Sequence, residues 1–493
     1  MSDSVRQVKV AIIGAGFGGV GMGITLKKQG FDGFTIFEGG PEVGGSWRTN
    51  TYPGCACDVP SHLYSYSFEL NPNWSQAFSP QEEIWEYIGN CAQKYGVMPY
   101  IEFEQRVTAT RFNSEKGVWE LTLNDNERVD ARVLIQATGA LSLAKYPDIE
   151  GRDTYKGVQA HVAHWDNNIN LKGKRVAVIG TGASAIQVVP TVAPEVEELF
   201  VYQRSASWVL PKKNVRFKKS TQALWKKFPL LQKFHRLSLY WMMEMAVPAL
   251  LWFPSLLKYG RDEHKALLNE SVSDPELRKK LTPDYELGCK RTLMSDDYFS
   301  AFERDNVELI TESLESITPK GIITADGIER EVDVIIYTTG YETGKPAFPF
   351  DITNERGETL QDYWGGQPKA YYGMNVTGFP NLGLIMGPNA GPGHTSVLVY
   401  QEAQYKYLTK YIRHILNNNV RALDVKESKL NEMFQWAQDR MKNSTWLSGC
   451  ASWYLNEDGT NSTMWPGFSF EYLIKTRRLH LDAYNQSPLD DAC

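Results

Sequence analysis

The first apolar run of the chain is broken by closely spaced glycines. The segment VKVAIIGAGFGGVGMGITLKKQG (8–30) predicts a buried strand, a tight turn and a helix that begins directly after the turn. Gly14, Gly16 and Gly19 have the GxGxxG spacing, in which the glycines form the turn, admit a pyrophosphate and pack the helix on the strand. The next apolar run, FDGFTIFEGG, ends near Glu38, which can accept hydrogen bonds from ribose hydroxyls. Together these features predict a dinucleotide site, although a glycine-rich turn alone would be weak evidence.

A second unit of the same kind begins at GKRVAVIGTGASAIQVVP, where Gly180, Gly182 and Ala185 repeat the spacing. Its second strand, EELFVYQRS, closes on Gln203 and Arg204 and has no acid there. An arginine at this position favours a 2′-phosphate, so we expect NADP(H) in this unit. The alternative is that Arg204 is only a solvated charge at the end of a strand.

Two apolar strands that close on Thr-Gly, ARVLIQATGAL and VDVIIYTTGYE, flank the second unit. This placement predicts an α/β chain of two Rossmann-like dinucleotide-binding domains, the second inserted in the first. We expect the first dinucleotide-binding domain at 1–140 and 345–493, and the second, NADP-binding domain at 141–344. The segment 212–290 is rich in helix formers and predicts a helical lobe on the second domain.

Composition and charge narrow the functional classes. With 493 residues the chain can hold two or three domains, and a net charge of −6 argues against a nucleic-acid partner. Six cysteines are too sparse for a disulfide framework and are typical of a reducing compartment. The N-terminal MSDSVRQVKV runs straight into a strand, so we expect a cytoplasmic protein.

One segment, LYWMMEMAVPALLWFPSLL (239–257), is apolar enough to suggest a membrane. Glu244, Pro248 and Pro254 argue against a straight spanning helix. Because basic residues precede the segment, helices lying on a bilayer surface are one alternative. A buried helical insertion is the alternative that we favour.

Two dinucleotides in one chain indicate electron transfer between them, which assigns FAD to the first site and NADPH to the second. The electrons then need an acceptor. Cys55 and Cys57 form a Cys-x-Cys pair, which is strained for disulfide cycling. His161 and His164 lack further ligands at metal-binding spacing, so no metal is expected. Dioxygen is the acceptor that is left.

At this point the sequence resembles the class B flavoprotein monooxygenases. GGSWRTNTYPGCACD (44–58) matches their motif after the first turn, and YKGVQAHVAHWD (155–166) is similar to the fingerprint of the Baeyer–Villiger monooxygenases. Tyr155 departs from that fingerprint by replacing phenylalanine. The resemblance extends over nearly the whole chain and to the shorter family members that act on open-chain ketones. It implies an NADPH- and O2-dependent enzyme that inserts oxygen beside a ketone carbonyl, through a peroxyflavin, to give an ester or lactone.

The resemblance also implies roles for single residues. Arg291 would be the active-site arginine and Asp58 the acid that holds it, while His161 and Trp165 would belong to the linker that couples domain rotation to nicotinamide binding. His164 has no fingerprint position and is expected to be a local packing residue. The FAD-binding candidates are Gly14, Gly16, Phe17, Gly18, Gly19, Glu38, Gly45, Ser46, Trp47, Asp58, Tyr64 and Val107. The NADP-binding candidates are Gly180, Thr181, Gly182, Ala183, Ser184, Gln187, Gln203, Arg204, Lys290 and Trp453.

Several alternatives stay open at this stage. Lys290 could be an ordinary solvated lysine, and Trp453 could be a core residue rather than part of a loop over the nicotinamide. An N- or S-oxygenating flavin monooxygenase would use the same two nucleotides, but it lacks the Trp-Asp ending of the linker motif and the active-site arginine. A non-catalytic redox sensor or membrane-docked flavoprotein has support only from the basic and apolar stretch 212–257.

Overall fold

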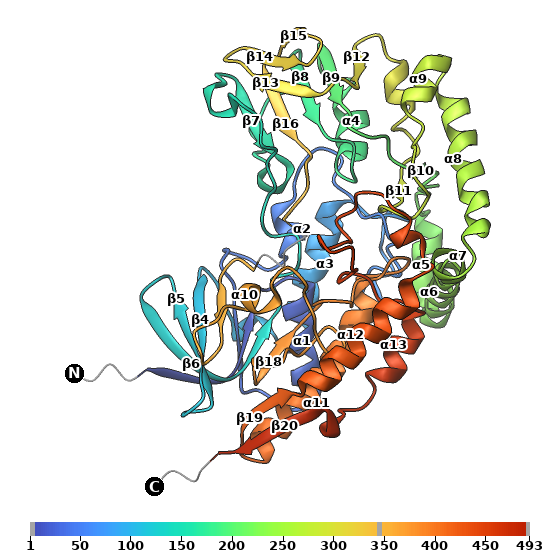
Figure 1. Cartoon of the computed structure of the whole chain (residues 1–493). Coiled ribbons are helices and arrows are strands. Elements are labelled where there is room, and N and C mark those ends of the chain that lie inside the picture. The colour runs from blue at the N-terminus through green and yellow to red at the C-terminus, as the bar shows by residue number, and fades with distance from the viewer. Residues whose placement is uncertain (1–4, 343–347, 490–493) are drawn as a thin grey trace.

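A mixed eight-stranded sheet forms the centre of the first unit (Figure 1) in the computed structural model, which describes residues 5–342 and 348–489. The strand order is β17-β4-β5-β6-β1-β2-β3, and β18 pairs with β6. Buried β1 lies in its middle, parallel to β2 and β6, as the apolar N-terminal run predicts. The strands are β1 (Arg6–Ile13), β2 (Phe34–Phe37), β3 (Ile101–Glu102), β4 (Val107–Asn113), β5 (Val118–Leu123), β6 (Glu127–Gln136), β17 (Asp351–Thr353) and β18 (Leu382–Leu384).

A second, fully parallel sheet has the order β12-β9-β8-β16-β7. All its strands lie between β6 and β17 in the sequence, so the chain leaves the first sheet, builds the second and returns. This confirms the predicted insertion, and the first predicted boundary falls in the connection after β6. The other boundary, near 344, lies outside the described residues. The strands are β7 (Val158–His161), β8 (Arg175–Ile179), β9 (Glu198–Tyr202), β12 (Val307–Ile310) and β16 (Val334–Tyr337).

Helix α1 (Phe17–Lys28) is buried almost all round because it packs between the first sheet and α11 (Val397–Asn417). A Cβ added at Gly21 would lie 2.5 Å from the ring of Tyr405, so a glycine is needed at this crossing. The other helices outside the lobe are α2 (Ser46–Thr49), α3 (Gln81–Lys94), α4 (Ala185–Val192), α10 (Leu360–Trp364), α12 (Glu427–Met441) and α13 (Ser469–Lys475).

The predicted helical lobe is present, but its contacts differ from the prediction. We expected it on the second unit, yet Gln222 donates to the carbonyl of Trp74 (2.9 Å) and Arg236 donates to the carbonyl of His62 (2.6 Å), both in the first unit. The lobe therefore lies along both units, at the outer edge of the molecule in Figure 1. Its helices are α5 (Lys219–Lys227), α6 (Pro229–Glu244), α7 (Val247–Leu251), α8 (Lys258–Ser271) and α9 (Pro275–Lys280).

Small strand pairs complete the architecture. β10 and β11 join the lobe to the second unit, β13, β14 and β15 form an antiparallel hairpin sheet, and β19 pairs with β20 near the C-terminus. Their bounds are β10 (Val209–Leu210), β11 (Leu293–Met294), β13 (Leu314–Ile317), β14 (Gly321–Thr324), β15 (Glu329–Glu331), β19 (Val420–Val425) and β20 (Tyr484–Pro488).

The apolar segment 239–257 is only in part the buried insertion that we favoured. Helix α7 is buried, with Leu251 almost inaccessible. In contrast, Trp241, Met245 and Phe253 are exposed. Among the described residues, no helix is both long and apolar enough to cross a bilayer.

Candidate active site

The first glycine turn connects β1 to α1 and leaves no room for side chains. Gly14 has φ +101°, a backbone conformation that side chains rarely adopt, and a Cβ at Gly19 would collide with the carbonyl oxygen of Gly14. Gly16 lies against Gly45 of the following loop, so that a Cβ on Gly45 would be 2.9 Å from the Cα of Gly16. The turn therefore presents bare backbone at the N-terminus of α1, which suits a pyrophosphate.

Glu38 stands at the end of β2, beside this turn. It is almost buried, and its two carboxylate oxygens accept from the backbone N–H groups of Ala15 (2.7 Å) and Gly40 (2.8 Å). These bonds fix the carboxylate while each oxygen keeps a lone pair for a ribose hydroxyl. The Nε of Arg48 is buried nearby without a partner among the described residues, and the Arg48 guanidinium lies close to Gly40. Sequence analysis missed Arg48, whose only signal was its place in the motif 44–58.

Three aromatic candidates for flavin contact are brought together next to the turn. The indole N–H of Trp47 donates to the Tyr64 hydroxyl (3.0 Å), and the ring of Phe17 meets that of Tyr64 edge to face at 5.4 Å. Ser46 begins the short helix α2 in the same loop. Val107, by contrast, is buried in β4 as part of the sheet core.

Asp58 and Arg291 meet although 233 residues separate them. Both the Nε (3.0 Å) and the Nη2 (2.5 Å) of Arg291 donate to Oδ2 of Asp58. The charge of Asp58 raises the pKa of Arg291. Burial opposes ionisation of Asp58, but the charge and hydrogen bonds of Arg291 outweigh it and hold the pKa of Asp58 below its usual range. The predicted pairing is thus present, and it fixes a permanent cation between the two units.

The second glycine turn, between β8 and α4, resembles the first in geometry. Gly180 has φ +112°, whereas a Cβ at Gly182 would meet no atom of the described part of the chain within 4 Å. The hydroxyl of Thr181 donates to the carbonyl of Ser205 (3.0 Å) and ties the turn to the end of β9. Ala183 and Ser184 lead into α4. The open space at Gly182 suits the approach of a second pyrophosphate.

Gln187 in α4 has a contact that the sequence did not indicate. Its side-chain amide donates to the carbonyl of Ala56 (2.9 Å) and its oxygen accepts from the Tyr52 hydroxyl (3.0 Å). Since these partners belong to the first unit, Gln187 joins the two units in this structure. Its role toward NADP stays a prediction.

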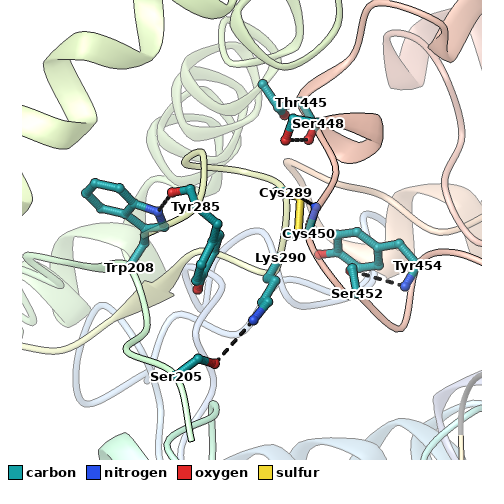
Figure 2. Close-up of a disulfide and its surroundings, with 10 residues drawn as sticks. All are labelled: Ser205, Trp208, Tyr285, Cys289, Lys290, Thr445, Ser448, Cys450, Ser452 and Tyr454. Atoms are coloured by element: carbon teal, nitrogen blue, oxygen red, sulfur yellow. Dashed lines mark hydrogen bonds between the residues drawn. A yellow bond between two sulfur atoms is a disulfide. The ribbon is translucent and has the colours of Figure 1, made fainter. Parts of the chain in front are cut away.

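Positive charge gathers at the end of β9. Lys290 donates to the hydroxyl of Ser205 (3.2 Å) and lies over the ring of Tyr285 at 4.3 Å (Figure 2). Burial, and next the charge of neighbouring Arg204, lowers the pKa of Lys290. Two like charges held close together suit a 2′-phosphate. Gln203 is instead buried and donates to the backbone carbonyl of Lys280 (2.7 Å).

A disulfide between Cys289 and Cys450 lies next to this cluster (Figure 2). It joins the residue before Lys290 to the C-terminal loop, across 161 residues and a Cα–Cα distance of 6.2 Å. This contradicts the expectation of cysteines that stay reduced. Cysteine spacing could not reveal the pair, because only the fold brings the two segments together.

Two neighbouring aromatic residues of the C-terminal loop differ in their exposure to solvent. Trp453 is 44% exposed, so it is not the core residue that we considered as an alternative. Tyr454 is buried; burial raises the pKa of its hydroxyl, and the charges of Arg291 and Asp58 act on it with opposite signs. Sequence analysis missed Tyr454, whose only signal was its position next to Trp453.

The predicted linker motif contributes β7 to the edge of the second sheet, and its role in domain rotation stays a prediction. His161, at the end of β7, is 2% exposed; its Nδ1 accepts from the N–H of Ala163 (3.0 Å), and its ring contacts Tyr146 of the outgoing connection. Burial lowers the pKa of His161 to about 4, so the ring is neutral near pH 7. Trp165 packs on the core of the second unit. His164 is exposed, and our expectation of a packing residue was wrong.

Tyr155, the departure from the fingerprint, has a structural role. Its hydroxyl donates to the carbonyl of Val332 (2.8 Å), and its ring fills the space beside Gly157 so that a Cβ there would collide with it. The hydroxyl that a phenylalanine would lack thus forms a hydrogen bond inside the second unit.

The structure gives little support to the two other electron acceptors that we considered, a dithiol pair and a metal centre. Burial raises the pKa of Cys55 to about 11 and raises the pKa of Cys57 further, which disfavours the reactive thiolate. Within 5–342 and 348–489, no group of three or more His, Cys, Asp or Glu side chains could hold a metal ion.

Comparison with known proteins agrees with this site. A family model described as flavin-binding monooxygenase-like matches residues 7–246. The Baeyer–Villiger monooxygenase of Pseudomonas aeruginosa is 39% identical over 484 residues, which cover 98% of this chain and 92% of that protein. The structure of cyclohexanone monooxygenase from Rhodococcus sp. Phi1 bound to NADP+ has a TM-score of 0.88 at 25% identity, over 98% of this chain and all of that one. The OTEMO complex with FAD and NADP has the same TM-score and coverage at 26% identity. With two glycine turns, an arginine held by Asp58 and this extent of similarity, the chain belongs to the Baeyer–Villiger monooxygenases.

Proposed function

We propose that this chain binds FAD at the first glycine turn and NADPH at the second, and converts a small ketone to an ester or lactone with dioxygen. The observation that carries the proposal is the Asp58–Arg291 pair, because it holds a fixed cation where a loop of the first unit meets the segment that carries Lys290. The relatives support the cofactors, since solved structures of similar fold contain FAD and NADP.

The residues present fit both cofactors. The first turn offers bare glycine backbone, the fixed carboxylate of Glu38 and the unpartnered Nε of Arg48. The second turn offers open space at Gly182, and Lys290 lies beside it for the extra phosphate that distinguishes NADPH from NADH. When bound, FAD supplies the two-electron chemistry that activates dioxygen.

Arg291 would contribute electrostatic stabilisation. Asp58 occupies two of its five N–H groups, so three remain to face negative charge that develops on the ketone oxygen. Asp58 keeps the guanidinium in one orientation and stays ionised because its pKa is low. Such a preorganised cation favours a reaction in which an oxygen nucleophile attacks a carbonyl, because negative charge then develops on the carbonyl oxygen. Oxygenation of a soft nucleophile needs no such anion stabilisation.

Product analysis with labelled oxygen tests the proposal. The purified chain, loaded with FAD, would be supplied with NADPH, ¹⁸O2 and linear, cyclic or aryl ketones in parallel. We expect an ester or lactone that carries one ¹⁸O atom, with NADPH preferred over NADH. Thioethers and tertiary amines serve as the competing substrates. If these are oxygenated and no ketone is, the chain is an N- or S-oxygenating enzyme and the proposal is wrong.

A further inference from the structure

Helix α6 buries polar side chains and exposes apolar ones. Its buried side is polar: Gln232 donates to the carbonyl of Asn71 (2.7 Å), Arg236 donates to that of His62 (2.6 Å), and Glu244 accepts from the N–H of Ser469 (3.0 Å). Gln232 and Glu244 are almost inaccessible. These residues recur every four or eight positions, so they form one stripe that anchors α6 to the first unit.

The opposite side of α6 is apolar and faces solvent. Leu230 is 77% exposed, Phe234 70% and Met245 77%, at spacings that put them on one face of the helix. We call this surface the outer lobe face and define it by Leu230, Phe234, Leu237, Trp241, Met245 and Phe253, all exposed. An amphipathic helix normally buries its apolar face, so this arrangement indicates a partner that covers it.

The outer lobe face continues onto a distant segment. The ring of Trp241 lies 6.1 Å from that of Phe470, and Ile474 of α13 is 69% exposed. Figure 1 shows α6 and α13 side by side at the same edge of the molecule, away from both sheets. The apolar surface is therefore built by tertiary packing and is wider than a single helix.

The rim of this surface is basic although the whole chain has a net charge of −6. Lys226, Lys227, Lys233 and Lys258 are exposed around it, and none of the described ion pairs involves them. Glu244 is the only acidic residue between Lys212 and Arg261, and it is buried against His394. The outer side thus combines apolar residues with uncompensated positive charge.

The outer lobe face could be covered by a second copy of the chain or by a lipid bilayer, and the positive charge of its rim decides between them. A second copy docked through the same face would bring its own lysines against these, and like charges would repel. An anionic bilayer offers both an apolar interior for the aromatic and aliphatic side chains and negative headgroups for the lysines. We propose that the outer lobe face docks on the surface of an anionic lipid bilayer, with α6 lying in the plane of the headgroups.

Vesicle co-sedimentation of the purified FAD-loaded chain tests this proposal. Vesicles of phosphatidylcholine mixed with phosphatidylglycerol should bind the protein at least about tenfold better than pure phosphatidylcholine. Binding should weaken as salt rises, because the Debye length falls from about 30 Å at 0.01 M to about 10 Å at 0.1 M. Equal binding to both vesicles, or none to the anionic ones, would overturn the proposal.

Two triple variants separate the apolar and the electrostatic contributions. Phe234→Ser with Trp241→Ser and Met245→Ser should abolish vesicle binding, and NADPH oxidation with a ketone should stay unchanged as a check on folding. Lys226→Glu with Lys227→Glu and Lys233→Glu should lower binding to the anionic vesicles at least about tenfold. Wild-type binding by either variant contradicts the role of this face.

A matched control carries the same charge change elsewhere. Lys172→Glu with Lys174→Glu and Lys320→Glu alters exposed lysines of the second unit and should bind anionic vesicles far better than the lobe variant. Sedimentation velocity tests the alternative that a second copy of the chain covers the outer lobe face. If the wild type is a dimer that the serine variant dissociates, and neither binds vesicles, the occupant is a second copy and the bilayer proposal is wrong.

Discussion

Replacement of Arg291 by alanine should separate the two halves of the catalytic cycle. We expect the variant to bind NADPH and to transfer its electrons to FAD at a rate close to that of the wild type, because Arg291 binds Asp58 whereas its neighbour Lys290 makes the contact with Ser205. Ester formation should fall by a factor of about 10²–10³, because negative charge on the ketone oxygen would lose its cation.

The magnitude follows from the geometry of the pair. Loss of one preorganised oxyanion donor typically costs about 2.7–4 kcal/mol, or 10²–10³ in rate. Among the described residues only Asp58 bonds to Arg291, so three of its N–H groups stay available, which would favour the upper end. Its side chain is nevertheless 45% exposed, and water screens part of its charge. We therefore expect ester formation to fall by a factor of about 10², unless closure of the two units excludes water from Arg291.

Rapid-mixing kinetics can measure the two steps apart. Anaerobic mixing with NADPH reports reduction of the flavin through its absorbance, and later mixing with oxygen and a ketone reports ester formed per reduced flavin. Lys290→Ala is the matched control: this neighbouring cation should weaken NADPH binding and leave the ester yield per reduced flavin intact. Arg291→Lys should recover only part of the activity, since an ammonium lacks the planar fork that Asp58 holds.

The reasoning fails if the Arg291→Ala variant, once reduced, forms ester at the wild-type rate. It also fails if the variant loses flavin reduction and oxygenation to the same extent, because the arginine would then serve nucleotide binding rather than oxygen transfer.

Three further predictions follow from the same structure. Arg204→Ala should raise the KM for NADPH far more than that for NADH in steady-state assays, and equal changes would remove its role toward the 2′-phosphate. Because the pKa of His161 drops from 6.5 to about 4 on folding, the unfolded chain binds its proton first as pH falls from 6.5 to 4. The free energy of unfolding should therefore decrease by up to about 3 kcal/mol over that range, and urea titrations of His161→Asn, which keeps an acceptor for the Ala163 N–H, should show a correspondingly smaller decrease. Cys450→Ser opens a covalent loop of 161 residues and should lower the free energy of unfolding by up to about 5 kcal/mol in denaturant titrations; an unchanged midpoint, with or without dithiothreitol, would show that the disulfide does not form.

Local features of the fold were predictable because short stretches of chain decide them. The turns at Gly14 and Gly180 need glycine whatever surrounds them, and both have the positive φ that the motif requires. The insertion of the second unit followed from two matching strands on either side of it. The resemblance located Asp58 and Arg291, and the structure then brought them into contact.

The errors share one cause, which is that tertiary packing decides which side chains are buried and which segments meet. The segment 239–257 looked like a buried insertion because it is apolar, but the polar side of α6 forms the anchoring contacts. His164 looked like a packing residue, yet the chain turns it outward. The lobe was assigned to the second unit because it lies within that unit's part of the chain, although it also bonds to His62 and Trp74 of the first.

By itself, then, the sequence determined the two nucleotide turns and the α/β class, since backbone sterics and apolar periodicity act over a few neighbouring residues, and its motifs determined the family by resemblance. Only the tertiary structure decided that Cys289 meets Cys450, that the charge of Arg291 acts on Tyr454 and that α6 turns its apolar face to solvent. Contacts of this kind depend on how distant segments pack, and no local pattern records which segments those are.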